Sequence, residues 1–364
     1  MNRKLVLLYV LTVLLTFTFS MSLRVQVAEA SGTIYIRADG SIDPPTAPIQ
    51  RKGDIYTLTG NITSDTDAIV IERNNMIFNG AGYTVQGTGG GFGILLSETR
   101  NVRIRNTQVK GFTYGIFLRA PQFSSSNCTI TENNITSNGG GVSLTSYFNI
   151  LSVNNITKNQ GPAVTLFYSH YTKIQGNNIS DNWDGLQIES SENCIVSGNK
   201  ITKNGVGVLL YRSSHNLICN NNFVNNMKHV HDISWDYPSI SPSINFWDNG
   251  YPSGGNYWSD HNPPDIYTGP YQNETGSDKI GDVPYIIDEN NTDRYPLIYP
   301  FGYVPSPDLD NDGIVDIFDL VRIALAYGSI PGIPIWKPYI DLNQDSIIDI
   351  FDLVIIAIHY GEHW

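Results

Sequence analysis

The chain has 364 residues, and its 34 Asp and Glu outnumber its 22 Lys and Arg, which gives a formal net charge of −12. This acidity argues against a protein that binds nucleic acid through a basic surface. The 33 Gly, with frequent Asn, Ser and Thr, predict many short strands joined by tight turns and disfavour a helical bundle outside the C-terminal region. The length allows one large and one small domain.

The N-terminal residues have the pattern of a signal peptide. The basic pair Arg3 and Lys4 precedes an apolar run of about fifteen residues, and Ala28-Glu29-Ala30 supplies the small residues of a cleavage site. We therefore assign residues 1–30 to a signal peptide and expect a secreted or cell-surface protein that begins near Ser31. An uncleaved anchor is the alternative, although the run is shorter than the ~20 apolar residues that span a bilayer.

Apolar side chains recur about every 22 residues through the middle of the chain. Three sets share this period, so each period contains three short strands. The sets are Ile94/Leu96, Ile116/Leu118, Val142/Leu144, Val164/Leu166, Leu186/Ile188 and Val208/Leu210; Ile135, Ile156, Ile179, Ile201 and Phe223; and Ile104, Ile130, Leu151, Ile174, Val196 and Ile218.

Three alternating strands cannot bury their apolar side chains within a single coil. Coils stacked about 4.8 Å apart through parallel pairing close a continuous apolar core. The sequence therefore predicts a mainly β fold, a right-handed parallel β-helix with an N-terminal cap over residues 31–226. The aromatic-rich segment 227–303 loses the period, and we interpret it as a C-terminal cap over the open edge of the last coil, with sugar stacking as the alternative role of its aromatic residues.

Asparagines recur in register at the corners of the predicted coils. We expect them to adopt left-handed backbone and to hydrogen-bond their equivalents one coil away, so their first role is structural. They are Asn134, Asn155 and Asn178, and Asn138, Asn159, Asn182, Asn204 and Asn226.

The three cysteines do not suggest a disulfide framework. Cys128 and Cys194 are predicted on one inward column three coils apart, and Cys219 on an outward column, so we expect free or buried thiols.

Seven Asn-x-Ser/Thr sequons fit a glycosylated extracytoplasmic surface, although an Asn-rich repeat also creates such triplets by chance. They begin at Asn61, Asn127, Asn134, Asn155, Asn178, Asn273 and Asn290.

Several motifs resemble those of a known family. TIYIRADG at 33–40, NGAGY at 79–83, the NNIT repeats, GNYWSD at 255–260 and DRYPL at 293–297 are similar to archaeal NosD-type β-helix proteins, over nearly all of residues 33–301. This resemblance implies the pectin-lyase fold and the wider class of carbohydrate-binding proteins and sugar hydrolases. It specifies the fold more strongly than the function.

After a short stiff linker at residues 304–307, an acidic loop has the spacing of a calcium site. Short side chains with oxygen at alternate positions converge on one hard cation, Gly313 allows the sharp turn, and the carbonyl of Ile314 adds a neutral ligand. The predicted ligands are Asp308, Asp310, Asp312, Ile314, Asp316 and Asp319.

The same pattern returns further along the chain, with Ser346 where the first loop has Gly, so we expect a strained turn and a weaker site. Each loop leads into an apolar helix, over residues 320–327 and 353–360, that ends at a glycine. The predicted ligands of the second loop are Asp341, Asn343, Asp345, Ile347, Asp349 and Asp352.

Two loops in register, each followed by one helix, resemble a type I dockerin at residues 308–364. The resemblance implies two bound calcium ions and a cohesin-like partner domain. It also implies that two adjacent positions of each loop select the partner, with burial inside the module as the alternative role of these residues. The positions are occupied by Ile317, Phe318, Ile350 and Phe351.

An enzyme on this fold needs paired carboxylates on one outward face, or calcium with a basic residue. Asp181 and Asp184 are the candidate catalytic acids, with Glu189 as a third, and the segment around Asp181 resembles the first motif of polygalacturonases. The next coil has Gly205-Val206-Gly207 where a second acidic pair should stand, and no Gly-His-Gly follows. The polygalacturonase set is therefore absent.

A glycan-binding surface needs fewer groups than an active site. One outward column is predicted to present aromatic and polar side chains one coil rise apart, matching an extended glycan, with ordinary β-helix surface as the alternative. The column contains Arg119, Thr145, Phe167, Glu189 and Tyr211, flanked by Tyr168, Gln187 and Arg212.

The resemblance to NosD proteins also implies copper delivery to nitrous oxide reductase, which requires soft or imidazole ligands. Met227, His229 and His231 are the candidate ligands, and two His at i and i+2 would share one face of a strand. Solvated cap residues are the simpler interpretation of this thin group.

The sequence as a whole predicts a non-catalytic surface protein. Its β-helix binds or scaffolds extracellular polysaccharide, and its dockerin attaches it to a cohesin-bearing partner. A polysaccharide lyase or glycoside hydrolase is the first alternative, and a NosD-like copper-handling protein is the second. We expect no nucleic-acid partner and no membrane span in the mature chain.

Overall fold

The computed structural model describes residues 32–120, 126–237, 239–310 and 312–364. The expected signal peptide, residues 1–30, lies outside the described residues. Within the described part of the chain, no helix is both long enough and apolar enough to cross a membrane.

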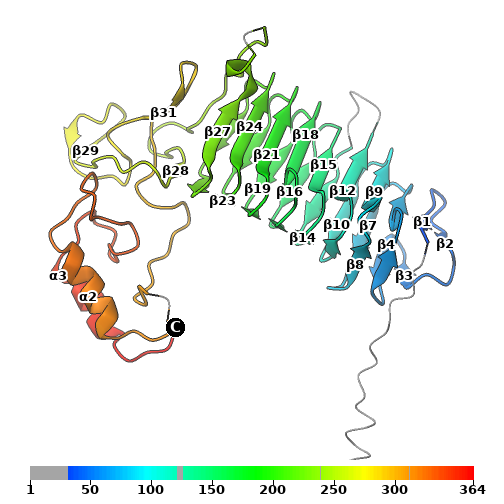
Figure 1. Cartoon of the computed structure of the whole chain (residues 1–364), viewed down its shortest axis with the longest axis horizontal. Helices are drawn as coiled ribbons and strands as arrows, with labels where there is room; N and C mark the ends of the chain where they lie inside the picture. Colours follow the sequence, from blue (N-terminus) through cyan, green and yellow to red (C-terminus); the bar gives the residue numbers. More distant parts are fainter. Residues whose placement is uncertain (1–31, 121–125, 238, 311) are drawn as a thin grey trace, which may run out of the picture.

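Three sheets wind around one axis and form a β-helix (Figure 1). Apart from one antiparallel edge strand in each of two sheets, each coil contributes one strand to each sheet, so neighbouring strands in a sheet are one coil apart in the chain. The β-helix has roughly eight turns of about 22 residues, as the period predicts.

The strands of the three sheets follow one another in coil order. The first sheet contains β1 (Ile34–Ile36), β6 (Ile69–Ile71), β9 (Phe92–Ser97), β12 (Tyr114–Arg119), β15 (Gly140–Leu144), β18 (Val164–Phe167), β21 (Asp184–Glu189), β24 (Val206–Tyr211) and β27 (Lys228–Asp232), with β2 (Ile42–Asp43) antiparallel at its edge. The second sheet contains β4 (Ile55–Leu58), β7 (Met76–Asn79), β10 (Val102–Arg105), β13 (Thr129–Thr131), β16 (Ile150–Ser152), β19 (Lys173–Gln175), β22 (Ile195–Ser197) and β25 (Leu217–Cys219), with β3 (Ile49–Lys52) antiparallel at its edge. The third sheet contains β5 (Ile62–Ser64), β8 (Thr84–Gly87), β11 (Gln108–Lys110), β14 (Asn134–Thr136), β17 (Asn155–Thr157), β20 (Asn178–Ser180), β23 (Lys200–Thr202), β26 (Asn222–Val224) and β28 (Tyr257–Trp258).

The inward columns form one continuous apolar core. Ile116, Val142 and Val164 are partners in successive parallel strands, and none of the three is exposed to solvent. Full burial of each such side chain stabilises the fold by about 1.5–3 kcal/mol relative to leaving it exposed. The predicted parallel β-helix with three strands per coil is confirmed.

Two columns of buried asparagine run along the third sheet, one at each end of its strands. Asn154 donates from its backbone N–H and its Nδ2 to Oδ1 of Asn177 at 2.9 and 3.0 Å. Asn177 donates in the same way to Asn199 at 2.9 Å, and its Nδ2 also reaches the carbonyl of Leu151. The ladders therefore supply partners for polar groups that water cannot reach. They contain Asn133, Asn154, Asn177, Asn199, Asn221 and Asn256, and Asn138, Asn159, Asn182 and Asn204 with the half-buried Asn226 at the end.

The structure corrects two expectations about the asparagines. Asn134, Asn155 and Asn178 lie on the strands and form an outer, exposed ladder with side-chain bonds of 2.8 and 2.6 Å, so they are not corner residues. The buried asparagines also lack left-handed backbone. In every case but Asn256 the residue before has it, as at Lys158 and Lys203 with φ of 57° and 55°, and this turn directs the following side chain inward.

The three thiols are free and buried, as expected. Burial raises the pKa of Cys128 to about 11 and that of Cys194 to about 12, which makes both thiols unreactive. Cys219 stands on the outward side of β25 but is covered, and its neighbours include the acids Asp248 and Asp293 of the cap segment.

The cap segment closes the end of the core with stacked aromatic rings. Trp258 stacks on Phe223 of the last coil at 4.4 Å and on Tyr285 at 4.2 Å, and Trp258 is buried. Buried Asp293 accepts hydrogen bonds from Asn256 N–H and Trp258 Nε1, and burial raises its pKa to about 7. For Trp258 the capping role is therefore the correct interpretation. The cap also contains η1 (Ile233–Trp235) and the pairs β29 (Tyr267–Thr268) with β30 (Glu274–Thr275) and β31 (Tyr285–Asp288) with β32 (Asn291–Asp293).

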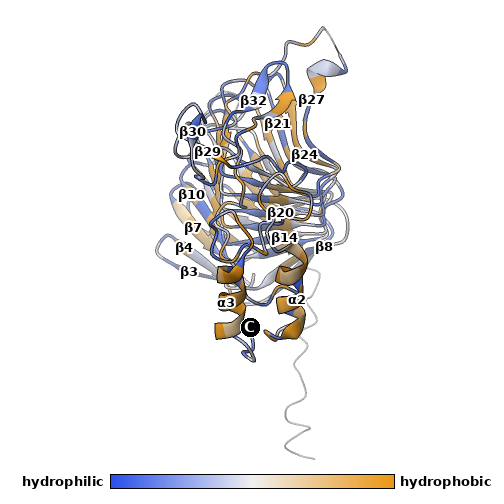
Figure 2. Ribbon diagram, turned by 90° about the vertical axis from the view of Figure 1, so that its left-hand side faces the viewer, coloured by the Kyte–Doolittle hydropathy of each residue, from blue (hydrophilic) through white to orange (hydrophobic). Residues whose placement is uncertain are grey.

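Two short helices follow, α2 (Ile317–Ala326) and α3 (Ile350–Ile358). They begin three residues earlier than the sequence suggested, because Asp316 and Asp349 form capping boxes with the acids three residues on. Figure 2 shows the two helices side by side and largely hydrophobic.

The C-terminal module shares its core with the cap. Its buried cluster contains Trp336, Val315 and Ile348 and also Ile298 and Tyr299, which precede the 304–307 linker. The linker therefore joins two segments that already pack together.

The buried ladder makes a specific stability prediction. Replacing Asn177 by Ala removes the acceptor of the Asn154 amide and two donors to buried carbonyls, and we expect a loss of about 2–4 kcal/mol in the free energy of unfolding. The matched control is its neighbour: Asn178→Ala removes only exposed ladder bonds and should cost less than about 0.5 kcal/mol. Urea unfolding of both variants measures the difference, and equal midpoints would contradict the role of the buried column.

Candidate functional site

The first acidic loop brings three carboxylates together. One oxygen from each of Asp308, Asp310 and Asp312 lies within 4.8 Å of the others, and this is the one group of three or more His, Cys, Asp or Glu among the described residues that could hold a metal ion. Oδ1 of Asp308 is buried and has no hydrogen-bond partner. A buried carboxylate oxygen without a donor is costly, so a cation among these oxygens would satisfy it.

The loop backbone is shaped around this cluster. Gly313, with φ of 91°, donates its N–H to Oδ2 of Asp308 at 3.0 Å, and Ile314 N–H donates to Asp312 at 2.9 Å. Asp310 accepts from the N–H of Asp312. These bonds fix the backbone of the loop around the three carboxylates.

The other two predicted acidic ligands hold the loop against α2. Buried Asp319 accepts from the N–H groups of Leu309 at 2.6 Å and Asp316 at 2.7 Å, so it closes the loop on itself. Asp316 accepts from Phe318 N–H at 2.8 Å and caps the helix. The structure thus assigns both acids a structural role, and their role as ligands, like that of the Ile314 carbonyl, stays a prediction.

The second loop repeats this framework. Asp352 accepts from Leu342 N–H at 2.7 Å and Asp349 N–H at 2.8 Å, and Asp349 accepts from Phe351 N–H. Within the loop, Asn343 donates from Nδ2 to Asp345 at 2.8 Å. Ile347, whose carbonyl oxygen is the predicted neutral ligand, follows this turn.

The second loop differs because it contacts the cap. Ser346 has φ of 70°, the strained turn expected from the loss of Gly, and its hydroxyl lies 2.9 Å from Oδ2 of Asp265 and 3.0 Å from Ser277 Oγ. Tyr299 donates its hydroxyl to Asp341, whose pKa burial raises to about 6. Ser346 therefore makes a contact with the cap that the loop pattern alone did not reveal.

The two helices present matching apolar pairs to solvent. Ile317 and Phe318 are 52% and 62% exposed, and Ile350 and Phe351 are 52% and 61% exposed. The alternative that these residues form the core of the module is therefore wrong. Further exposed apolar residues continue each face: Val321, Leu325, Val354 and Ile358.

A groove of about 890 Å³ lies where the third sheet turns into the first. It contains the candidate acids Asp181 and Asp184 together with Trp183, Lys203 and Met227. Burial raises the pKa of Asp184, whereas Asp181 is exposed. Glu189 does not line this groove; it stands at the other end of β21.

The predicted glycan column is in register. Phe167, Glu189 and Tyr211 are direct partners in β18, β21 and β24. Their neighbours cover them in part: Tyr168 lies edge-on to Phe167 at 4.8 Å, and the guanidinium of Arg212 lies 5.3 Å from the Tyr211 ring. Burial raises the pKa of Glu189. Gln187 pairs with Thr165 and Leu209 beside this column, and Arg119 and Thr145 continue it toward the N-terminus.

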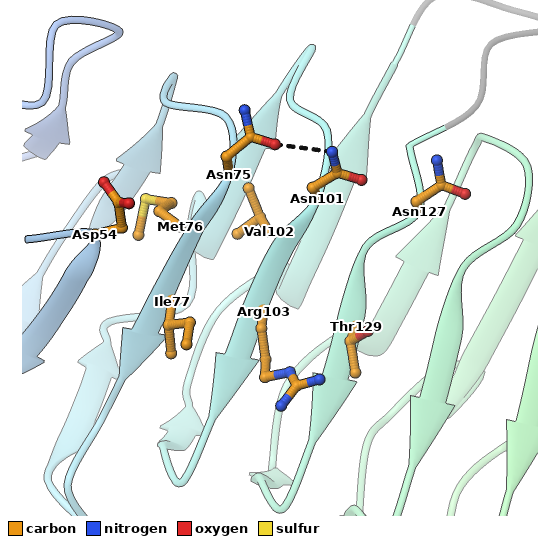
Figure 3. Close-up of a pocket in the computed structure, with 9 residues that line it drawn as sticks. All are labelled: Asp54, Asn75, Met76, Ile77, Asn101, Val102, Arg103, Asn127 and Thr129. Carbon is orange, nitrogen blue, oxygen red and sulfur yellow. Dashed lines mark hydrogen bonds between the residues drawn. The ribbon is translucent and has the colours of Figure 1, made fainter.

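A shallower depression of about 440 Å³ lies on the outer face of the second sheet (Figure 3). Asn75, Asn101 and Asn127 line it from successive coils, and Asn101 donates to Asn75 at 2.8 Å. Its acid, Asp54, is paired with Arg73 at 2.6 Å. This depression therefore lacks a carboxylate pair for hydrolysis, and it borders the sequon at Asn127.

The candidate copper ligands do not converge. Residues 229 and 230 are both buried, so the alternation of β27 is interrupted here. His229 therefore packs against Phe223 and Trp258, and its Nε2 lies 3.2 Å from Asp260. His231 faces outward, with Nε2 2.7 Å from Asp236. The expectation that the two His share one face is wrong. Met227 is 92% exposed, so this group does not fit a copper site.

Comparisons with known proteins agree with this architecture. The family model described as periplasmic copper-binding protein (NosD) matches residues 51–263. None of the curated proteins matches the chain.

Several solved structures show similarity. The periplasmic alginate epimerase AlgG is 19% identical with a TM-score of 0.39, over 48% of this chain and 51% of the epimerase, so this chain spans about half of its length. Tailspike protein 2 of an Escherichia coli O157:H7 bacteriophage is 16% identical with a TM-score of 0.42, over 70% of this chain and 41% of the tailspike. The A-module of the Azotobacter vinelandii mannuronan C-5 epimerase AlgE6 is 9% identical with a TM-score of 0.25, over 49% of this chain and 85% of the module. These likenesses carry no functional argument.

The family match covers more than half of the chain and runs through most coils of the β-helix into the start of the cap. With the fold and the match in agreement, this chain belongs to the NosD family.

Proposed function

We propose that this is an extracytoplasmic adaptor whose C-terminal module is a calcium-loaded type I dockerin and whose β-helix binds or scaffolds polysaccharide. The observation that carries the proposal is the repetition at the C-terminus. Two acidic loops, each closed by a capping box, place an Ile-Phe pair at the same position with nearly the same exposure. An extracytoplasmic location agrees with the periplasmic description of the family.

Calcium is the ion that suits the first loop. Carboxylate and carbonyl oxygens are ligands for hard cations, whereas copper and zinc favour imidazole or thiolate. The three carboxylates repel one another without a cation, and Asp308 has a buried oxygen to offer. The second loop has Asn343 before Asp345, where a full aspartate triad would have a carboxylate, so its site carries less negative charge.

The Ile-Phe pairs suit a protein partner. Adjacent aliphatic and aromatic side chains are costly to leave in water on an acidic module, and aromatic anchors are typical binding hot spots. Because the two pairs are nearly equivalent, a cohesin-like domain would use one pair at a time, in two orientations.

The copper function named in the family description is not proposed for this chain. The groups that would bind copper are separated, as are the three buried thiols. A polysaccharide lyase or glycoside hydrolase remains the second candidate, because the groove with Asp181 also holds Asp184, whose pKa burial raises as a general acid requires.

Calcium should protect both loops. In hydrogen exchange of the full chain, calcium at about 100 times its Kd should slow exchange in peptides from 308–319 and 341–352 by up to a hundredfold. Asp310→Asn should remove the response of the first loop alone, and Asp345→Asn that of the second loop alone. Peptides from β16 to β22 serve as the internal control and should not change. Equal exchange in calcium and in chelator would contradict the proposal.

Docking should depend on both Ile-Phe pairs together. Against purified type I cohesin domains in biolayer interferometry, Phe318→Asp or Phe351→Asp alone should weaken binding less than about threefold, because the other pair remains. The double variant should lose at least about a hundredfold while keeping its calcium response. Undiminished binding by the double variant, or binding in chelator, would refute this docking surface.

The adaptor function predicts no hydrolysis. Incubation with neutral and uronic polysaccharides should release no reducing ends and no unsaturated products, and Asp184→Asn should leave this result unchanged. Product release that Asp184→Asn abolishes would instead establish the hydrolase.

A further inference from the structure

The groove at the corner between the third and first sheets has an unusual wall. One position after each buried asparagine of the second ladder, successive coils carry Gln160, Trp183, Gly205 and Met227. Trp183 is 71% exposed and Met227 is 92% exposed, although both are large apolar side chains. Gly205 separates them, so two apolar walls stand two coils apart with a gap between them.

The gap is imposed by the backbone. A Cβ on Gly205 would lie 2.4 Å from the carbonyl oxygen of Trp183, so no side chain can occupy this place without a shift of the chain. Neighbouring coils are hydrogen-bonded here, through Val206 N–H to Trp183 O at 3.3 Å and Lys228 N–H to Gly205 O at 3.0 Å. The walls and the floor therefore belong to the rigid part of the fold.

The spacing suits one ring. Two coil rises are about 9.6 Å, so a ring midway lies about 4.8 Å from each wall, within the distance of stacked rings. The groove volume of about 890 Å³ leaves room for further units of a chain to extend along it.

The rim is polar and balanced in charge. It carries the exposed carboxylate of Asp181 and the ammonium groups of Lys203 and Lys228, and the buried carboxyl group of Asp184 also lines the groove. Lys228 also contacts Nδ1 of His231, which fixes its position. Such a rim offers both acceptors and donors and does not select an ion of either sign. A ligand with one apolar face and a belt of hydroxyl groups matches this arrangement.

We propose that this groove binds one hexopyranose ring of a neutral polysaccharide, with Trp183 as the stacking platform and Met227 as the opposite wall. The site is distinct from the outward column with Phe167 and Tyr211. The inference deepens the proposed polysaccharide binding and rests on that half of the proposed function, not on the docking module.

The test measures binding of the full chain to soluble dextran, mannan, galactan and a mixed-linkage β-glucan by affinity gel electrophoresis and calorimetry, with alginate and polygalacturonate as the acidic arm. At least one neutral polymer should bind more tightly than both acidic polymers. Trp183→Ala should weaken that binding at least tenfold, Trp183→Phe should restore most of it, and Met227→Ala should weaken it about threefold. Trp235→Ala, at an exposed tryptophan of η1 outside the groove, is the matched control and should change nothing.

The possible results distinguish failure of this binding site from failure of the proposed polysaccharide binding. If the wild-type protein binds a neutral polymer and Trp183→Ala binds it equally well, the glycan site is elsewhere and only this inference fails. If the protein prefers the acidic polymers, the neutral ligand is wrong. If it binds none of the polymers, the proposed polysaccharide function fails with it. The double variant Phe318→Asp, Phe351→Asp should bind as the wild type does, because the docking faces take no part.

Discussion

The fold depends on hydrogen-bond partners for the peptide groups that are trapped between stacked coils. Each coil must turn at its corners, and a turn exposes peptide groups that the next coil then covers. The buried asparagines meet this requirement by donating to one neighbour and accepting from another, as Asn177 does between Asn154 and Asn199. With the turns satisfied, the aliphatic columns can close a dry core over many coils. At the end of the β-helix, Asp293 takes the place of the next asparagine and receives the amide of Asn256.

The candidate sites lie where this regularity stops or is modified. The groove exists because Trp183 and Met227 stand on either side of Gly205, where the backbone of the adjacent coil comes too close for any side chain. The acidic loops lie beyond the last coil, in a module whose helices each leave one apolar face exposed. Both places have exposed aromatic side chains. The groove is surrounded by charges of both signs, whereas the first acidic loop holds carboxylates that a cation would neutralise.

The sequence predicted the β-helix because the apolar period is a property of the chain itself, independent of how the coils twist. It could not decide which asparagine of an NNIT repeat faces inward, since this depends on the left-handed residue before it, such as Val153, whose side chain gives no hint of that conformation. The loop ligands followed from spacing, but the contact of Ser346 with Asp265 joins residues far apart in the chain and needed the structure. The His229 and His231 pair was misjudged because strand alternation breaks at β27, where two consecutive residues are buried. Trp183 and Met227 were both visible in the sequence, and aligning the residues after the ladder would have placed them two coils apart.

The contact between the second acidic loop and the cap determines how far the protein can reach. Tyr299 and Ile298 belong to the core of the terminal module, and Ser346 is hydrogen-bonded to the cap, so residues 304–307 do not act as a free tether. A flexible connection would let a bound partner sample a volume set by linker length, and the local concentration of that partner at the β-helix would fall as the linker grew. Here the separation between the α2–α3 face and the corner groove is instead set by the cap, because the groove lies on the last coils of the β-helix, next to the cap. The cap, rather than the linker, is then the rigid spacer between the α2–α3 face and this groove, and coils added at the N-terminal end of the β-helix would leave that distance unchanged.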